Sequence, residues 1–249
     1  MVVKAEKIKA LKNIPNSGYD RIKVEFLFHS NKLEGSTFTR ENLEKYLQEQ
    51  IIEGSHEVDD IYETINSTKL FDFVVDTLGE PLHERLIKEF HQLLKKNTKD
   101  QERGFVGGWK KIPNMILGVD GKLDLAQPHE VPRKMEDLLR GWNNGPKNFE
   151  AVMKFHAEFE QIHPFQDGNG RVGRFIMLKQ CVEHDVDIIF IDETFSTAYK
   201  QGLFLAQTEG DYTQLREVFR SSQKLIEERL QFLEATLLLL GAVSTDEVK

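Results

Sequence analysis

The strongest constraint on the fold is a helical pattern that runs into a glycine-rich segment at residues 163–174. Residues 149–162 place apolar side chains at helical spacing, so they predict an amphipathic helix. Pro164 blocks simple continuation of that helix, which puts His163 at its end or just past it. Three glycines then occur within six residues, and an apolar helix follows. We therefore expect a glycine-rich loop between two helices.

The rest of the chain is also mostly helical in pattern. Helical spacing of apolar residues recurs in several further segments, at about 20–35, 59–78, 82–95, 135–142 and 221–240. The period changes between Met115 and Leu125, where Asp120-Gly121 is typical of a two-residue hairpin turn. The pattern predicts a mainly α fold with one small β-hairpin. We divide it into N-terminal helices at 1–100, a core at 101–220 and a C-terminal helix at 221–249.

The composition is that of a globular protein and excludes several functional classes. Of 249 residues, 39% are apolar and 30% are charged, with 33 basic and 41 acidic residues, giving a net charge of −8. An acidic chain argues against general nucleic-acid binding, which needs a basic surface. The lone Cys181 offers neither an internal disulfide nor a zinc cluster. The N-terminus lacks a signal-peptide pattern, and the apolar run at 235–243 is shorter than the roughly 20 residues a membrane span needs. These features predict a cytoplasmic protein with no membrane partner.

Residues 163–174, which read HPFQDGNGRVGR, combine the groups that hold phosphate. The N–H groups of a glycine-rich loop and of a helix N-terminus converge on anions, and missing Cβ atoms permit close approach. Arg171 and Arg174 add two permanent cations three residues apart. Asp167 is an oxygen ligand suited to Mg²⁺. His163 is a proton acceptor near neutral pH.

Two other interpretations of this segment stay open at this point. Gly168 to Gly173 also matches G-x-G-x-x-G, and Asp192 lies about 20 residues further on, as in a dinucleotide-binding unit. That fingerprint needs a strand before the first glycine, whereas residues 149–162 have helical spacing. The segment could also be a plain turn with surface arginines. The crowding of His, Asp, Asn and two Arg into twelve residues argues against a plain turn.

The segment HPFQDGNGRVGR resembles the signature of the Fic (filamentation induced by cAMP) family, H-P-F-x-[D/E]-G-N-G-R-x-x-R, and matches it at every fixed position. The resemblance implies a Fic-type helical bundle with a hairpin flap. It also implies transfer of AMP from ATP to a Ser, Thr or Tyr hydroxyl of a protein, with release of pyrophosphate.

The resemblance also implies a role for each residue of the motif. His163 would be the general base, Phe165 would anchor the loop in the core and Asp167 would hold Mg²⁺. The anion hole for the α- and β-phosphates would be formed by Gly168, Asn169 and Gly170. Arg171 would bind the β-phosphate. Arg174 would bind the γ-phosphate and orient the α-phosphate for attack.

A second resemblance lies far away, at residues 30–35, which read SNKLEG. It is similar to the inhibitory motif of the family, [S/T]-x-x-x-E-[G/N]. Ser30 and Glu34 are four residues apart and so share a helix face, and Glu34 sits at a predicted helix C-terminus, where the dipole disfavours an anion. The resemblance implies that Glu34 pairs with Arg174 and blocks the productive pose of the γ-phosphate. The alternative is a solvated surface glutamate.

Two looser matches complete the set. Residues 108–114, followed by the hairpin, resemble the flap with which the family aligns its target by strand-like pairing. An ordinary surface hairpin is the alternative. Tyr199, with Leu203, is the candidate contact for adenine, and a core tyrosine is the alternative. His156 is interpreted as structural.

Together these observations predict an autoinhibited, Mg²⁺-dependent protein adenylyltransferase that uses ATP. Its partners would be a target protein and, by self-modification, the chain itself. Family members often dimerise, so a homodimer is compatible with the resemblance. Two alternatives remain. One is a nucleotide-binding sensor without transfer, and the other is a Fic-type enzyme with another donor or with de-AMPylating activity.

Overall fold

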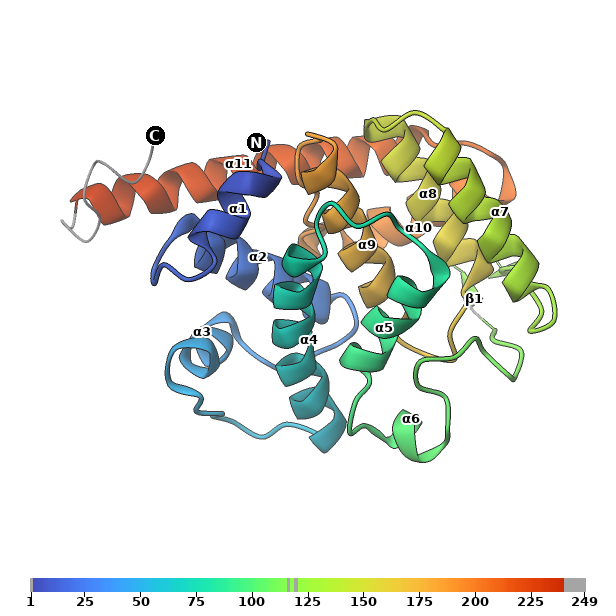
Figure 1. Cartoon of the computed structure of the whole chain (residues 1–249), viewed down its shortest axis with the longest axis horizontal. Coiled ribbons are helices and arrows are strands. Elements are labelled where there is room, and N and C mark those ends of the chain that lie inside the picture. The colour runs from blue at the N-terminus through green and yellow to red at the C-terminus, as the bar shows by residue number, and fades with distance from the viewer. Residues whose placement is uncertain (1, 116, 119–120, 240–249) are drawn as a thin grey trace.

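The structure is a computed structural model that describes residues 2–115, 117–118 and 121–239 and is mainly helical (Figure 1). Its elements are α1 (Ala5–Leu11), α2 (Gly18–Lys32), α3 (Arg40–Glu49), α4 (Val58–Asp76), α5 (Glu84–Leu94), α6 (Lys99–Glu102), β1 (Leu117–Gly118), β2 (Gly121–Lys122), α7 (Val131–Asn144), α8 (Phe149–Ile162), α9 (Asn169–Glu183), the 3₁₀ helix η1 (Glu193–Phe195), α10 (Ser196–Thr208) and α11 (Thr213–Leu239). The predicted mainly α fold is confirmed.

Helix α9 is the centre of the molecule. It contacts α2, α4, α5 and α8, and in Figure 1 it lies between the N-terminal helices and the pair α7 and α8. Every side chain from Arg171 to Val182 is buried, apart from Gly173, which has none. Phe175 of α9 packs against Phe26 of α2 with ring centroids 4.7 Å apart. Helix α9 is therefore held by helices from both halves of the chain.

Helix α8 begins and ends where the sequence predicts. The Asn148 side chain accepts a hydrogen bond from the Ala151 N–H at 3.0 Å and so caps its N-terminus. At the other end His163 takes the left-handed conformation, with φ +49°, and its N–H donates to the Phe159 carbonyl. This conformation is uncommon for a residue other than glycine and occurs often at functional positions.

Helix α9 begins earlier than the glycine pattern suggests. Gly168 precedes it with φ +77°, and the helix starts at Asn169. Gly170 and Gly173 therefore lie inside the helix and not in a loop. Residues 149–162 are helical and residues 188–191 form no strand, so the dinucleotide-binding interpretation is wrong.

One hydrophobic cluster runs through the chain, from Val3 before α1 to Leu230 in α11. The borders predicted at 100 and 220 fall inside α6 and α11, and the division into three parts stays a prediction. Helix α2 ends at Lys32, and residues 33–35 form a turn. Glu34 therefore lies just beyond the last turn of α2.

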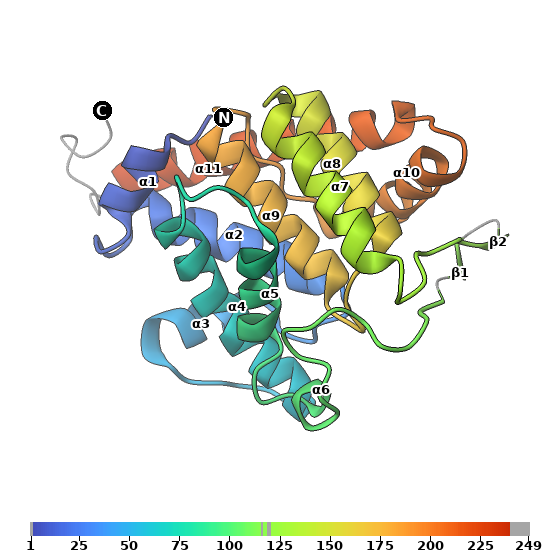
Figure 2. The ribbon, with the colours of Figure 1, turned by 45° about the vertical axis from the view of Figure 1, so that its right-hand side comes forward.

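The strands β1 and β2 form a short antiparallel pair in which Leu117 is opposite Lys122 and Gly118 is opposite Gly121. Figure 2 places this pair at the edge of the molecule, beyond the ends of α7 and α10. Asp120 of the predicted turn lies outside the described residues, as do residues 240–243 of the apolar run. Among the described helices, none is long and apolar enough to cross a membrane.

Candidate active site

The side chain of His163 is a neutral imidazole. Its Nδ1 lies 3.3 Å from the carbonyl oxygen of Glu160. Because a carbonyl only accepts, the ring proton is on Nδ1, which leaves Nε2 as an acceptor. Burial, together with the Lys110 ammonium, lowers the pKa of His163 to about 4. The imidazole is therefore unprotonated at neutral pH.

Asn169 clamps the loop that follows His163. Its Oδ1 accepts from the Phe165 N–H at 2.7 Å, and its Nδ2 donates to the Phe165 carbonyl at 2.9 Å. Phe165 is fully buried, as expected of a loop anchor. Both polar ends of the Asn169 amide are thus used within the loop, and its contact with phosphate stays a prediction.

His91, on α5, is a residue that the sequence analysis did not single out. Its ring stacks on Phe165 with centroids 3.9 Å apart and planes 3° apart. Its Nδ1 accepts from the Gly107 N–H at 3.0 Å, so the proton is on Nε2, which lies 3.1 Å from the Asp167 carbonyl. Burial lowers the pKa of His91 to about 4, which keeps this neutral form. The available signal was its place in the buried stripe of α5, four residues after Ile87.

Arg174 is held by the two residues of the predicted inhibitory motif. Its Nε donates to Ser30 Oγ at 3.0 Å, and its Nη2 donates to the Ser30 carbonyl at 2.9 Å and to Glu34 Oε1 at 2.7 Å. Arg174 is 2% exposed. Desolvation by itself raises the pKa of the Glu34 carboxyl. The positive charges of Arg174 and Arg171 outweigh this effect, so the pKa of Glu34 is lowered overall. The contact is therefore a charged pair.

The Glu34 carboxylate lies against the first turn of α9. A Cβ atom added to Gly170 would be 2.3 Å from Glu34 Oε1 and 3.0 Å from Arg174 Nη1. The N-terminus of a helix attracts anions through its dipole and its free N–H groups. Glu34 thus occupies a place suited to an anion, and only a residue without a Cβ leaves room for it there.

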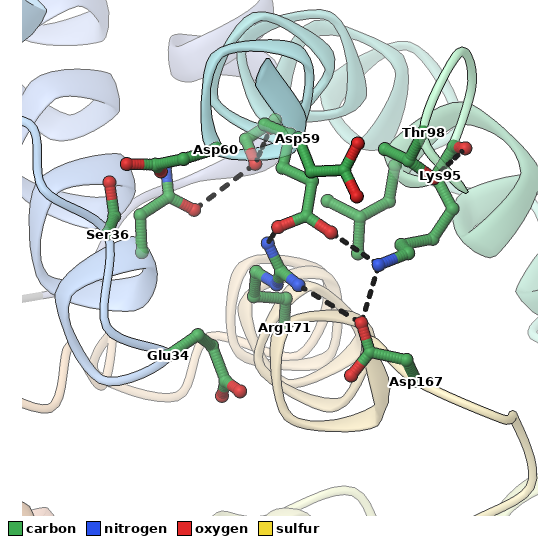
Figure 3. A network of polar contacts seen from close by, with 12 residues as sticks. Glu34, Ser36, Asp59, Asp60, Lys95, Thr98, Asp167 and Arg171 are labelled. Carbon is green, nitrogen blue, oxygen red and sulfur yellow. Dashed lines mark hydrogen bonds and ion pairs between the residues drawn. The ribbon is translucent and has the colours of Figure 1, made fainter. Parts of the chain in front are cut away.

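Asp167 and Arg171 belong to a second group of charges (Figure 3). Asp167 Oδ2 is 2.5 Å from the Lys95 ammonium and 3.8 Å from Arg171 Nη2. Desolvation by itself raises the pKa of Asp167, but the Lys95 ammonium outweighs this effect and lowers the pKa to about 2. Arg171 also forms an ion pair with Glu63 of α4. Glu63 and Lys95 were not predicted, because they lie about 70 to 110 residues from the motif in sequence.

The donor set at this place suits a magnesium ion held jointly with phosphates. No group of three or more His, Cys, Asp or Glu able to bind a metal occurs among the described residues. Magnesium typically takes one or two carboxylates and completes its shell with substrate phosphates and water. Asp167, whose side chain is 58% exposed, fits that requirement.

Residues 110–114 run alongside the motif loop. The Lys110 N–H donates to the Pro164 carbonyl at 2.8 Å. Asn114 Nδ2 donates to the carbonyl oxygens of Phe165 and Gln166, both at 3.1 Å. The segment expected to form the flap therefore contacts the motif, whereas its action on a target stays a prediction.

Tyr199 is buried, and its hydroxyl lies 2.7 Å from Nε2 of His156. His156 is also buried. Burial, together with the Arg174 charge, lowers the pKa of His156 to about 3, so its ring is neutral. This arrangement has the features of a core tyrosine. A contact between Tyr199 and adenine stays a prediction, as does the part of Leu203, which is partly buried against the core.

The comparison with protein families identifies the domain. The family model of the Fic/DOC family matches residues 81–181, which include α5, α7, α8 and most of α9. Residues 81–181 thus match the Fic/DOC domain. The Fic structures agree in fold. A Fic-domain signaling protein of Bacteroides thetaiotaomicron, 24% identical, matches with a TM-score of 0.70 over 92% of this chain and 89% of that one. Fic-1 of C. elegans, 18% identical, matches with a TM-score of 0.72 over 92% and 67%.

Curated relatives of the chain are named as adenylyltransferases. A probable protein adenylyltransferase of Aquifex aeolicus is 38% identical over 80 residues, which is 31% of this chain and 24% of the relative. The protein adenylyltransferase Fic of Drosophila willistoni is 26% identical over 212 residues, 79% of this chain and 40% of the relative. The chain thus spans between a quarter and two fifths of the length of these relatives.

Proposed function

We propose that this chain is an autoinhibited protein adenylyltransferase that transfers AMP from ATP to a Ser, Thr or Tyr hydroxyl and releases pyrophosphate. The observation that carries the proposal is the Glu34 carboxylate held by Arg174 against the first turn of α9. A phosphate would bind at the same place, through the same cation and the same helix N-terminus. The names of the curated relatives support the reaction class.

The neutral imidazole of His163 suits the chemical step. In this proposal the target hydroxyl oxygen attacks the α-phosphorus, and its proton passes to Nε2 of His163. The bond between the α-phosphorus and the bridging oxygen then breaks, and pyrophosphate leaves. Such transfers depend mainly on positioning and on stabilisation of charge, which Arg171 and Arg174 would supply. Mg²⁺ held by Asp167 would neutralise charge on the leaving phosphates.

Inhibition follows from competition for one cation. Arg174 has Ser30 on one side and Glu34 on another, so a γ-phosphate would have to displace the carboxylate to reach it. Release of Glu34 would free Arg174 without moving the buried body of α9. Self-modification, a homodimer and alignment of the target by residues 108–114 belong to the same proposal.

The test is the intact mass of the full chain after incubation with Mg-ATP. We compare the wild type with Glu34→Gly and His163→Ala, and with Glu41→Gly, an exposed glutamate in α3, as a matched control. An increment of one AMP that is larger in Glu34→Gly, absent in His163→Ala and unchanged in Glu41→Gly would support donor, reaction and inhibition together.

Other outcomes lead to the alternatives. An increment of one phosphate would keep the site and change the reaction. No increment in any variant, combined with measurable ATP binding, would favour a nucleotide sensor or an enzyme that acts only on another protein. An equal increment in wild type and Glu34→Gly would contradict the inhibitory role of Glu34.

A further inference from the structure

Four charged side chains form a closed ring beside the motif loop. Glu63 of α4 uses both carboxylate oxygens, Oε1 for the Lys95 ammonium and Oε2 for Nη1 of Arg171. Lys95 in turn lies 2.5 Å from Asp167 Oδ2, and Nη2 of Arg171 lies 3.8 Å from the same oxygen. Figure 3 shows Lys95 and Arg171 both directed toward Asp167. Positive and negative groups alternate around the ring.

Three members of the ring are enclosed, and one faces solvent. The side chains of Lys95, Arg171 and Glu63 are 4%, 7% and 15% exposed, whereas that of Asp167 is 58% exposed. Lys95 also forms an ion pair with Asp100, with its Nζ 2.7 Å from Oδ2 of Asp100. The enclosed members therefore act as fixed supports for the outward-facing carboxylate.

Within the ring, Arg171 keeps a hydrogen-bond donor without a partner, and Asp167 keeps part of its negative charge. Nε of Arg171 is buried and has no hydrogen-bond partner in the part of the chain that the structure describes. A buried donor without a partner costs free energy, which a phosphate oxygen would recover. Lys95 divides one positive charge among Asp167, Glu63 and Asp100, so it neutralises Asp167 only in part.

We propose that Glu63 and Lys95 are positioning residues that set the Arg171 guanidinium and the Asp167 carboxylate for a magnesium–nucleotide complex. Neither residue lies in the motif, and both come from helices that precede it. The inference rests on the proposed function, because it assumes that residues 163–174 bind a nucleotide. Replacing a residue that hydrogen-bonds to a metal ligand typically lowers metal affinity or activity by about 10- to 100-fold.

Charge sharing predicts opposite effects for the two positioning residues. Without the Glu63 carboxylate, Lys95 has fewer competitors and neutralises Asp167 more fully, so more Mg²⁺ is needed. Without the Lys95 ammonium, the nearest cation of the ring is removed from Asp167 and Arg171 remains only at 3.8 Å, so less Mg²⁺ is needed. A role in stability alone would shift both variants in the same direction.

The experiment measures binding of an ATP analogue with a methylene bridge between the α- and β-phosphates, by calorimetry over a series of Mg²⁺ concentrations. The full chain with Glu34→Gly is the reference. We expect Glu63→Gln to weaken binding about tenfold and raise the half-maximal Mg²⁺ concentration, and Lys95→Met to lower that concentration. Asp59→Asn, also on α4 and paired with Lys99, is the control and should match the reference.

A second measurement keeps the inference separate from the proposed function. A thermal-unfolding cycle of Glu63→Gln and Arg171→Lys without nucleotide reports whether the ring couples them. If the stability changes of the two substitutions are additive, Glu63 and Arg171 are not coupled, and the inferred ring is wrong. If the two residues are coupled but Glu63→Gln and Lys95→Met shift the half-maximal Mg²⁺ concentration in the same direction, the positioning role is wrong and the proposed function is unaffected. Coupling with no analogue binding by the reference at any Mg²⁺ concentration would overturn the proposed function and the inference with it.

Discussion

Glu34 and Arg174, separated by 140 residues, meet with Oε1 and Nη2 2.7 Å apart at the first turn of the central helix α9. The Arg174 side chain is 3% exposed, whereas the Glu34 side chain is 31% exposed and approaches from a turn. The cation is therefore fixed by the core, and the carboxylate is the partner that can leave. This asymmetry suits a switch in which only the turn after α2, residues 33–35, has to move.

Glu34→Gly is expected to increase AMP transfer by about 10- to 100-fold. A hydrogen bond between charged groups contributes roughly 1.5–3 kcal/mol, and each 1.4 kcal/mol corresponds to about tenfold. Initial rates of incorporation from labelled ATP would measure the effect. Glu34→Gln, which keeps the shape but not the charge, should fall between wild type and Glu34→Gly. A rate for Glu34→Gln below that of wild type would contradict the electrostatic explanation.

Gly170→Ala is expected to change stability with a sign that depends on Glu34. Alanine inside a helix usually stabilises by about 0.5–1 kcal/mol relative to glycine. In the wild type the new Cβ would meet Glu34 Oε1 at 2.3 Å and oppose that gain, whereas in Glu34→Gly this obstacle is absent. Denaturant unfolding of the four variants gives the coupling.

Gly141→Ala, on α7, is the control for this cycle, since a Cβ at Gly141 would meet no atom within 4 Å. Its gain should be the same with and without Glu34. Equal effects of Gly170→Ala in the two backgrounds would show that the carboxylate does not lie against α9.

His163→Asn is expected to reduce transfer by roughly 10²–10⁴-fold, the usual contribution of a general base, while nucleotide binding persists. Asparagine tolerates the left-handed backbone at this position better than alanine does. His129→Ala, at an exposed histidine, is the control. Substantial transfer by His163→Asn would exclude His163 as the base.

The pH profile of transfer supplies an independent check on His163. Burial and Lys110 lower its pKa from 6.5 to about 4, so the neutral, proton-accepting form predominates above about pH 5. The rate should stay level from pH 6 to pH 8 in Glu34→Gly and fall as the pH drops toward 4. A rate halved near pH 6.5 would indicate a solvated imidazole.

Glu160→Gln is expected to make the fold more stable above neutral pH. Burial raises the pKa of Glu160 from 4.5 to about 8, with a nearby Arg174 opposing the change. The folded state therefore holds its proton more tightly than the unfolded state, and this contribution to stability is lost as pH rises from about 4.5 through about 8. At about 1.4 kcal/mol per pKa unit, the difference from wild type should reach a few kcal/mol at pH 9.

Denaturant unfolding at pH 5, 7 and 9 would measure that difference. Glu217→Gln, at an exposed position on α11, serves as the control and should show no such trend. A gap between Glu160→Gln and wild type that does not widen with pH would mean that Glu160 is ionised throughout.

The sequence by itself determined the elements whose signals are local. The apolar spacing of residues 149–162 and the proline at 164 predicted a helix, and α8 begins and ends accordingly. The residues of 163–174 are contiguous, so their chemistry could be read together. The start of α9 was missed, because glycines that usually mark a loop here lie in a helix, where Glu160 and Glu34 come close to the backbone.

Only the tertiary structure decided which distant groups complete the site. The resemblance to the Fic family predicted that Glu34 meets Arg174, whereas nothing local predicted Glu63, His91 or Lys95 beside the motif loop. The partner of a charged residue on an amphipathic helix cannot be predicted from the local sequence. Ion pairs between residues about 70 to 110 positions apart form only once the helices pack around α9. Periodicity and caps act within one or two helical turns, and the buried ion pairs depend on the assembled core.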